Sequence, residues 1–117
     1  MGNKIVALTD AKFDQILEEN PCIFIEFWAD WCVPCKNFRA VIETLVDESP
    51  QMVFATVDVD HEKVLAEEFE VRSIPAIMVL RDRCVVSMET GAMSGSNVRE
   101  LLDQALSLNV SEIKESD

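Results

Sequence analysis

The chain has 117 residues, which is enough for one compact domain that needs no disulfide framework to fold. Hydrophobic residues make up 49% and charged residues 27%, as in a globular protein rather than a disordered or fibrous one. Lys and Arg number 10 and Asp and Glu number 22, and the net charge of −12 opposes nucleic-acid phosphates and anionic membranes. We therefore expect no nucleic-acid partner and no membrane partner.

The longest apolar stretches, residues 22–25 and 75–80, are far too short to cross a bilayer. The first residues lead into a strand rather than a secretory signal peptide, so we expect a cytoplasmic protein. Cysteines are reduced by default in that compartment, and a close pair among them then indicates redox chemistry or metal binding. The four cysteines are Cys22, Cys32, Cys35 and Cys84.

The first part of the chain predicts a strand, a helix and a second strand. Residues 5–8 form a short apolar strand, and Thr9 is expected to cap a helix that ends at Asn20 and Pro21. Residues 22–28 form a nearly continuous apolar run rich in Ile and Phe, which is typical of a central strand buried on both faces. The helix is expected to bury Phe13, Ile16 and Leu17 on one face.

The remaining apolar spacing predicts the order βαβαβαββα, an α/β fold with a mixed, mostly parallel central sheet flanked by helices. We expect one domain over residues 1–108 and a polar, acidic tail over residues 109–117. The later elements are a helix from Pro34 to Ser49, a strand at 52–59, a helix at 62–69, strands at 75–80 and 85–89 joined by a hairpin, and a final helix after Ser94.

Cys32 and Cys35 stand three residues apart where a buried strand gives way to a helix. Neighbours on one helical turn meet the separation of roughly 4.4 to 6.8 Å between Cα atoms that a disulfide requires. Free N–H groups and the positive end of the helix dipole stabilise a thiolate there, so Cys32 is expected to be the nucleophile. Cys35, one turn further in, is expected to be shielded until a mixed disulfide forms and then to resolve it.

A C-x-x-C pair also supplies half of many zinc sites. Here the remaining donors are Cys22, Cys84 and His61, and none of them belongs to a second paired motif. A role as two small core residues does not account for Pro34 between the cysteines or for the two tryptophans around the loop. We therefore expect no metal and no cofactor in this chain.

Residues 27–36, FWADWCVPCK, resemble the F-W-A-x-W-C-G-P-C-K signature of the thioredoxin family, with Val33 in place of glycine. Residues 71–76, VRSIPA, are similar to the family segment that carries a cis proline beside the active site. The resemblance extends over residues 5–108 without a large insertion. It implies the thioredoxin fold and the activity of a protein-disulfide oxidoreductase.

The resemblance also implies a substrate groove. Ile74, before the expected cis Pro75, is expected to offer its backbone to an extended substrate segment, as in strand addition. The partners it implies are disulfide-containing client proteins and a reductase that restores the dithiol of a monomeric carrier. The other groove residues are Trp31, Val33, Pro34 and the small pair Gly91 and Ala92.

Glu26 interrupts the apolar strand 22–28, where burial of a carboxylate carries a considerable desolvation cost and raises its pKa. A carboxyl group poised there can relay a proton to or from Cys35, directly or through water. Alternation alone also permits an edge strand with Glu26 in solvent. The thioredoxin family usually has Asp in this place, so the longer side chain alters the reach to Cys35.

Other residues depart from the family pattern or have ordinary explanations. Thr56 stands where many thioredoxins carry a lysine, so one charge that lowers the pKa of the buried acid is expected to be absent. Val33 before a proline is pushed toward extended geometry, which is expected to alter the surroundings of Cys32. Cys22 and Cys84 are interpreted as buried or incidental thiols, and His61 is interpreted as a surface residue.

The leading hypothesis is a thiol-disulfide electron carrier that reduces client disulfides through Cys32 and Cys35. One alternative is a binding or chaperone-like module on the same fold, in which the cysteines matter little. Another is a disulfide oxidase or isomerase, because the two residues between the cysteines help to set the reduction potential.

Overall fold

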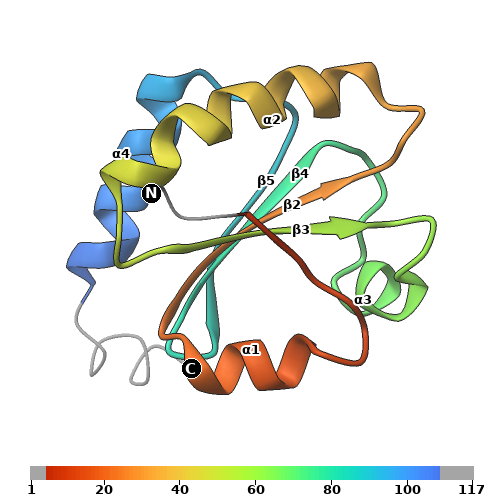
Figure 1. Ribbon diagram of the computed structural model, residues 1–117, viewed down its shortest axis with the longest axis horizontal. Helices are drawn as coiled ribbons and strands as arrows, with labels where there is room; N and C mark the ends of the chain where they lie inside the picture. The colour runs from red at the N-terminus through yellow and green to blue at the C-terminus, as the bar shows by residue number, and fades with distance from the viewer. Residues whose placement is uncertain (1–4, 109–117) are drawn as a thin grey trace.

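A computed structural model describes residues 5–108, and within them the predicted order of strands and helices is confirmed (Figure 1). The proposed tail at 109–117 lies outside the described residues. Among the helices described, none is long and apolar enough to span a membrane. The elements are β1 (Val6–Ala7), α1 (Phe13–Glu19), β2 (Cys22–Trp28), α2 (Val33–Leu45), the 3-10 turn η1 (Val46–Glu48), β3 (Val53–Asp58), α3 (Lys63–Glu68), β4 (Ala76–Arg81), β5 (Cys84–Thr90) and α4 (Gly95–Ser107).

The five strands form one mixed sheet in the order β1-β3-β2-β4-β5, so β2 is central as its apolar run predicts. β1 and β2 run parallel to β3, whereas β4 runs antiparallel to both β2 and β5. Only β4 runs against the direction of the other four strands, so the sheet is mixed and mostly parallel in strand direction, as expected. A tight turn reverses the chain between β4 and β5, where Asp82 and Arg83 adopt the positive φ angles of 50° and 71° that short hairpin loops require.

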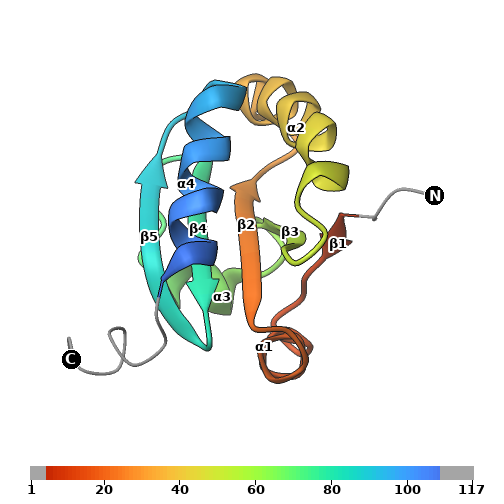
Figure 2. The ribbon, with the colours of Figure 1, turned by 90° about the vertical axis from the view of Figure 1, so that its left-hand side faces the viewer.

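Helices cover both faces of the sheet, with α2 and α4 on one face and α1 and α3 on the other (Figure 1). Figure 2 shows α4 in front of β4. Alternate residues of β2 point to opposite faces, so Phe24 packs in the cluster with Phe38 of α2, whereas Phe27 packs in the cluster with Leu65 of α3. Glu26 lies two residues from Phe24 and therefore faces the side that α2 covers.

Two helix ends show where local sequence signals succeed and fail. Ser94 caps α4 as expected, because its Oγ accepts a hydrogen bond from the backbone N–H of Asn97 at 3.1 Å. Thr9 was expected to cap the first helix, but its Oγ1 accepts from the N–H of Lys12 at 3.2 Å and closes a preceding turn. The N-cap residue of α1 is Lys12, and no side chain caps this helix.

Candidate active site

The redox-active pair lies at the N-terminus of α2, directly after β2 and a short loop. Cys32 is the N-cap residue, and its Sγ accepts a hydrogen bond from the backbone N–H of Cys35 at 3.2 Å. Pro34 fits the first turn because a proline there loses no helical hydrogen bond. Cys32 and Cys35 form a disulfide with a Cα–Cα distance of 5.3 Å. The spacing of the two cysteines thus has the expected geometric consequence.

The two cysteines differ in exposure, but less than the sequence suggests. Cys35 is completely buried, as predicted, and Cys32 in the disulfide retains only 4% of its accessible surface. Exposed apolar side chains flank the pair, since Trp31 is 69% and Val33 65% exposed. The two side chains therefore place exposed apolar surface directly beside the disulfide.

Other groove residues predicted from the sequence lie at the same end of the sheet. The peptide bond between Ile74 and Pro75 is cis, which confirms the expectation for this segment. Pro75 directly precedes β4, whose first residue pairs with Phe27 near the end of β2. The Pro75 carbonyl accepts a hydrogen bond from the N–H of Gly91 at 2.7 Å. This bond joins the start of β4 to the end of β5.

Gly91 has a φ of +92°, a conformation that residues with a Cβ rarely adopt. A Cβ added to it meets no atom within 4 Å, so backbone conformation rather than lack of space requires glycine here. Ala92 beside it is exposed and Ile74 is half-buried. The loop at Gly91 and the cis-proline loop therefore lie at the end of the sheet where β2 leads into the loop before Cys32.

The loop after β3 also contacts the redox loop, a connection that the sequence analysis did not identify. Trp31 Nε1 donates a hydrogen bond to Asp60 Oδ2 at 2.9 Å. Asp58 Oδ1 accepts from the N–H of Asp60 at 2.9 Å and so holds this loop in shape. His61 is on the surface as expected, and its hydrogen bond to Asp58 raises the pKa of its ring. Asp58 and Asp60, at the end of a parallel strand, could have indicated a functional loop. The sequence alone did not show that this loop contacts Trp31.

Glu26 is fully buried in the central strand, so the alternative of a solvated edge residue is wrong. Desolvation raises the pKa of its carboxyl group, and a hydrogen bond and the positive charge of Arg39 partly oppose that rise. Arg39 Nε donates to Glu26 Oε1 at 2.5 Å. Among the described residues, Glu26 Oε2 has no hydrogen-bond partner.

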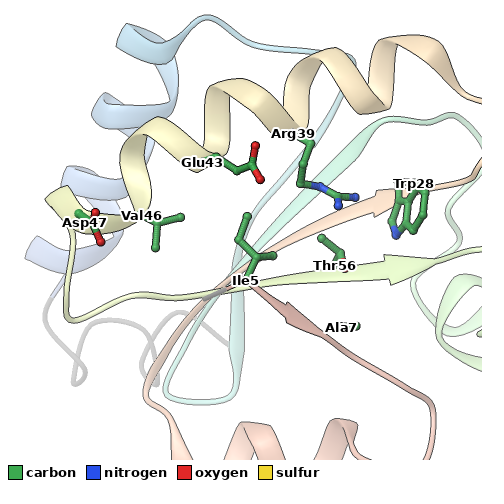
Figure 3. A pocket seen from close by; sticks show the side chains of 8 residues that line it. All are labelled: Ile5, Ala7, Trp28, Arg39, Glu43, Val46, Asp47 and Thr56. Atoms are coloured by element: carbon green, nitrogen blue, oxygen red, sulfur yellow. The ribbon is translucent and has the colours of Figure 1, made fainter. Parts of the chain in front are cut away.

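The lysine that many thioredoxins carry near the buried acid is absent from β3, as expected, but another cation takes its place beside Glu26. Thr56 does pair with Glu26 in the sheet register and is itself buried, so β3 supplies no cation. The charge comes instead from α2, where Arg39 lies one turn after Cys35 and stacks over Trp28 with Cζ 4.8 Å from the ring centroid (Figure 3). The spacing of four between Cys35 and Arg39 was the signal in the sequence, because it places both residues on one helix face.

An open pocket of about 650 Å³ lies beside this ion pair, between α2 and the edge of the sheet at β1 and β3 (Figure 3). Arg39 extends into it from α2, and its own side chain is about one quarter exposed whereas that of Glu26 is fully covered. Arg39 therefore stands between the buried carboxylate and solvent. The pocket is lined by Ile5, Ala7, Trp28, Arg39, Glu43, Val46, Asp47 and Thr56.

The other two cysteines are free and do not form a second pair. Cys22 is buried, which raises the pKa of its thiol, and Cys84 is half-buried. In the sheet register Arg81 pairs with both, so their backbones lie two strand spacings apart, about 9.6 Å, which is beyond the Cα separation of a disulfide. Within residues 5–108, no three His, Cys, Asp or Glu side chains gather as a metal site.

Comparison with known proteins agrees with this architecture. The thioredoxin family profile matches residues 4–105. A Streptomyces coelicolor protein assigned as thioredoxin 2 is 35% identical over 111 residues, which cover 95% of this chain and 83% of that protein. A thioredoxin of Buchnera aphidicola is 32% identical over 105 residues, covering 88% of this chain and 96% of the relative.

Solved structures give the same result. A mutant thioredoxin from Halobacterium salinarum superposes with a TM-score of 0.84 at 25% identity, over 91% of this chain and 94% of the other. A Plasmodium falciparum thioredoxin superposes with a TM-score of 0.79 at 30% identity, over 86% of this chain and 98% of the other.

A five-stranded mixed sheet flanked by helices, with a C-x-x-C disulfide at a helix N-terminus, defines a thiol-disulfide oxidoreductase of the thioredoxin fold. The chain belongs to the thioredoxin family. Proteins of this family interact with reductases and with disulfide-containing substrates.

Proposed function

We propose that this thioredoxin reduces disulfides in other proteins, with Cys32 as the attacking thiolate and Cys35 as the resolving thiol. The observation that carries the proposal is the position of Cys32 as the N-cap of α2, where the backbone N–H of Cys35 already donates to its sulfur. A thiolate at Cys32 receives that hydrogen bond and the positive end of the helix dipole. Cys35 has no accessible surface and so attacks only a disulfide already formed at Cys32.

The reaction proceeds by two exchanges. The Cys32 thiolate attacks one sulfur of a client disulfide, forms a mixed disulfide and releases the other client sulfur as a thiolate. Cys35 then loses its proton and attacks the Cys32 sulfur, which breaks the mixed disulfide and releases the second client thiolate. The client gains two electrons and the protein is left with the Cys32–Cys35 disulfide. A reductase partner supplies two electrons and two protons to restore the dithiol.

Glu26 is proposed as the group that takes the proton from Cys35 during resolution and returns it when the dithiol is restored. Its burial supports the role, because a carboxyl group with a raised pKa exchanges protons more readily near neutral pH than an exposed one. The free Oε2 atom supports it further, since a proton can bind there without breaking the contact with Arg39.

Client proteins are proposed to bind along the exposed apolar surface beside the disulfide, with the Ile74 backbone pairing to an extended segment. Support comes from the exposure of Trp31 and Val33 and from the cis bond before Pro75. Pro34, Gly91 and Ala92 complete the proposed groove. A reducing, cytoplasmic setting is proposed because free thiols such as Cys22 and Cys84 are typical of that compartment.

Equilibration with glutathione buffers tests the direction of electron flow. A reduction potential near that of thioredoxins, about −270 mV, supports the reductase, whereas a value near −120 mV indicates an oxidase. Insulin reduction with a thioredoxin reductase tests turnover. A Cys32→Ser, Cys35→Ser double variant that keeps the full cellular activity of the protein would instead favour the binding or chaperone-like module.

A further inference from the structure

The two carboxylate oxygens of Glu26 differ in their contacts, because Arg39 binds only one of them. Oε1 accepts the Arg39 Nε–H, whereas Oε2 is buried and has no partner among the described residues. A buried oxygen without a hydrogen-bond donor is costly for stability, so its retention calls for an explanation. Oε2 is the atom at which a proton can be added while the ion pair stays in place.

Besides its hydrogen bond to Glu26, the Arg39 side chain is held by a contact with Trp28. Its guanidinium lies over the Trp28 ring with Cζ 4.8 Å from the centroid, within the range of a cation-π contact (Figure 3). Because Trp28 and Glu26 are two residues apart on β2, they face the same side of the sheet and present one surface to Arg39. A lysine has no planar group to stack and donate in this way, so arginine is specifically suited to the site.

Among residues 5–108, the remaining surroundings of Glu26 provide no second cation. Its cross-strand neighbours are Thr56 on β3 and Ile77 on β4, neither of which titrates near neutral pH. Asp58 and Glu89 face the same side of the sheet from farther along β3 and from β5, and Asp58 is already bound to His61. α4 packs on this face with the apolar residues Val98, Leu102 and Ala105. The acidic residues that line the pocket together with Arg39 are Glu43 and Asp47.

We propose that Arg39 is a positioning residue for disulfide exchange: it holds one oxygen of Glu26 and leaves the other free to take the proton of Cys35. The inference rests on the proposed function of Glu26. During resolution the Cys35 thiol transfers its proton to Oε2, directly or through water, and the resulting thiolate attacks the Cys32 sulfur. The Cys32–Cys35 bond forms, the bond from Cys32 to the client sulfur breaks, and the client leaves as a thiolate.

Arg39 sets the pH range in which this transfer operates. Without the guanidinium, only burial acts on Glu26, and its pKa rises further. A smaller fraction of Glu26 is then ionised at neutral pH, so fewer molecules have an acceptor for the Cys35 proton. The proton step slows near pH 7 and recovers at higher pH, whereas the attack by Cys32 does not depend on Glu26.

Stopped-flow reaction of the reduced protein with dithionitrobenzoate separates the two steps. The first thionitrobenzoate anion is released when Cys32 attacks, and the second is released when Cys35 resolves the mixed disulfide. Arg39→Met removes the charge and the donor but keeps an apolar stem over Trp28. We expect its second phase to be about tenfold slower at pH 7, with a pH midpoint raised by about one unit and an unchanged first phase.

Matched variants isolate the cause. Arg39→Lys restores the charge and should recover part of the shift in the pH midpoint. Arg99→Met removes an arginine from an exposed pair with Glu48, whose Nε–Oε1 distance is 2.8 Å, and should leave both phases unchanged. Glu26→Gln should slow the second phase and remove its pH midpoint, and adding Arg39→Met to it should have no further effect.

The outcomes separate the two hypotheses. If Glu26→Gln slows resolution but Arg39→Met leaves the pH midpoint in place, Arg39 has no positioning role although the proton relay stands. If Glu26→Gln leaves the second phase unchanged, Glu26 does not accept the Cys35 proton. The positioning role of Arg39 is then wrong as well. NMR titration of the carboxyl carbon of Glu26 provides an independent measurement, and an unchanged midpoint in folded Arg39→Met overturns the inference.

Discussion

The Sγ of Cys32 accepts a hydrogen bond from the backbone N–H of Cys35 at 3.2 Å, so one residue of the redox pair caps the helix that carries the other. The same contact that begins α2 is thus available to stabilise a thiolate. The arrangement favours the proposed unequal roles, because only the sulfur of Cys32 lies at the open end of the helix and Cys35 is one turn inside it.

Cys35→Ser is expected to accumulate stable mixed disulfides between Cys32 and client proteins. The resolving thiol is absent in this variant, so the first exchange occurs and the second does not. Trapping on an affinity support followed by non-reducing electrophoresis measures the product. Cys32→Ser is the matched control and should trap little, because Cys35 is buried. Equal trapping by both variants, or by neither, would show that the two roles are wrongly assigned.

Gly91→Ala is expected to destabilise the protein by roughly 1 to 2 kcal/mol, since φ at this position is +92° and a Cβ is disfavoured there. Steric overlap contributes nothing, because no atom lies within 4 Å of the added Cβ. Gly95→Ala is the control: it lies in α4, and its Cβ would make an ordinary contact with Val41 Cγ1 at 3.8 Å. That change should stabilise by roughly 0.5 to 1 kcal/mol. Urea unfolding measures both, and equal effects would contradict the conformational argument.

Ser94→Ala is expected to cost about 1 kcal/mol, because its Oγ satisfies the N–H of Asn97 at the start of α4. Ser96→Ala is the matched control, since Ser96 is exposed inside the same helix and caps nothing. That variant should unfold at the same urea concentration as the parent protein or slightly above it. A Ser94→Ala midpoint equal to that of Ser96→Ala would mean that the cap contributes no stability.

Elements with strong local signals could be predicted from the sequence. The apolar run at residues 22–28 identified the central strand, and Ser94 identified the start of α4 because its cap needs only residues close in the chain. The resemblance to thioredoxins located the cis bond before Pro75. Thr9 misled the prediction of the first helix, since a side chain that can cap a helix can equally close a turn.

Features that depend on tertiary structure could not be predicted in the same way. The spacing from Cys35 places Arg39 on the same face of α2, but its contact with Glu26 depends on how α2 crosses β2. The sequence analysis correctly expected no charge at Thr56 on the neighbouring strand, but it did not identify the cation that α2 supplies instead. The contact between Trp31 and Asp60 was missed for the same reason, since it joins loops that follow different strands.

We expect the burial of Glu26 to have opposite effects on stability and on the proposed proton transfer. Its folded pKa is raised, so the native state binds more protons than the unfolded state between the unfolded and folded pKa values. Stability therefore falls as pH rises through that window, and the penalty is fully present above the folded pKa. Its size is about 1.4 kcal/mol for each unit by which the pKa is raised.

Glu26→Leu should accordingly raise the free energy of unfolding by more at pH 8 than at pH 4, while insulin reduction becomes slower because the proton acceptor is gone. Arg39 loses its partner in this variant but is partly exposed, so its charge can be hydrated. Glu48→Leu is the control of opposite sign, because Arg99 lowers the pKa of exposed Glu48 and its removal should reduce stability more at pH 8 than at pH 4. Urea unfolding at both pH values and the insulin assay decide the question. If Glu26→Leu shows the same stability change at both pH values and unchanged activity, Glu26 neither titrates abnormally nor relays a proton.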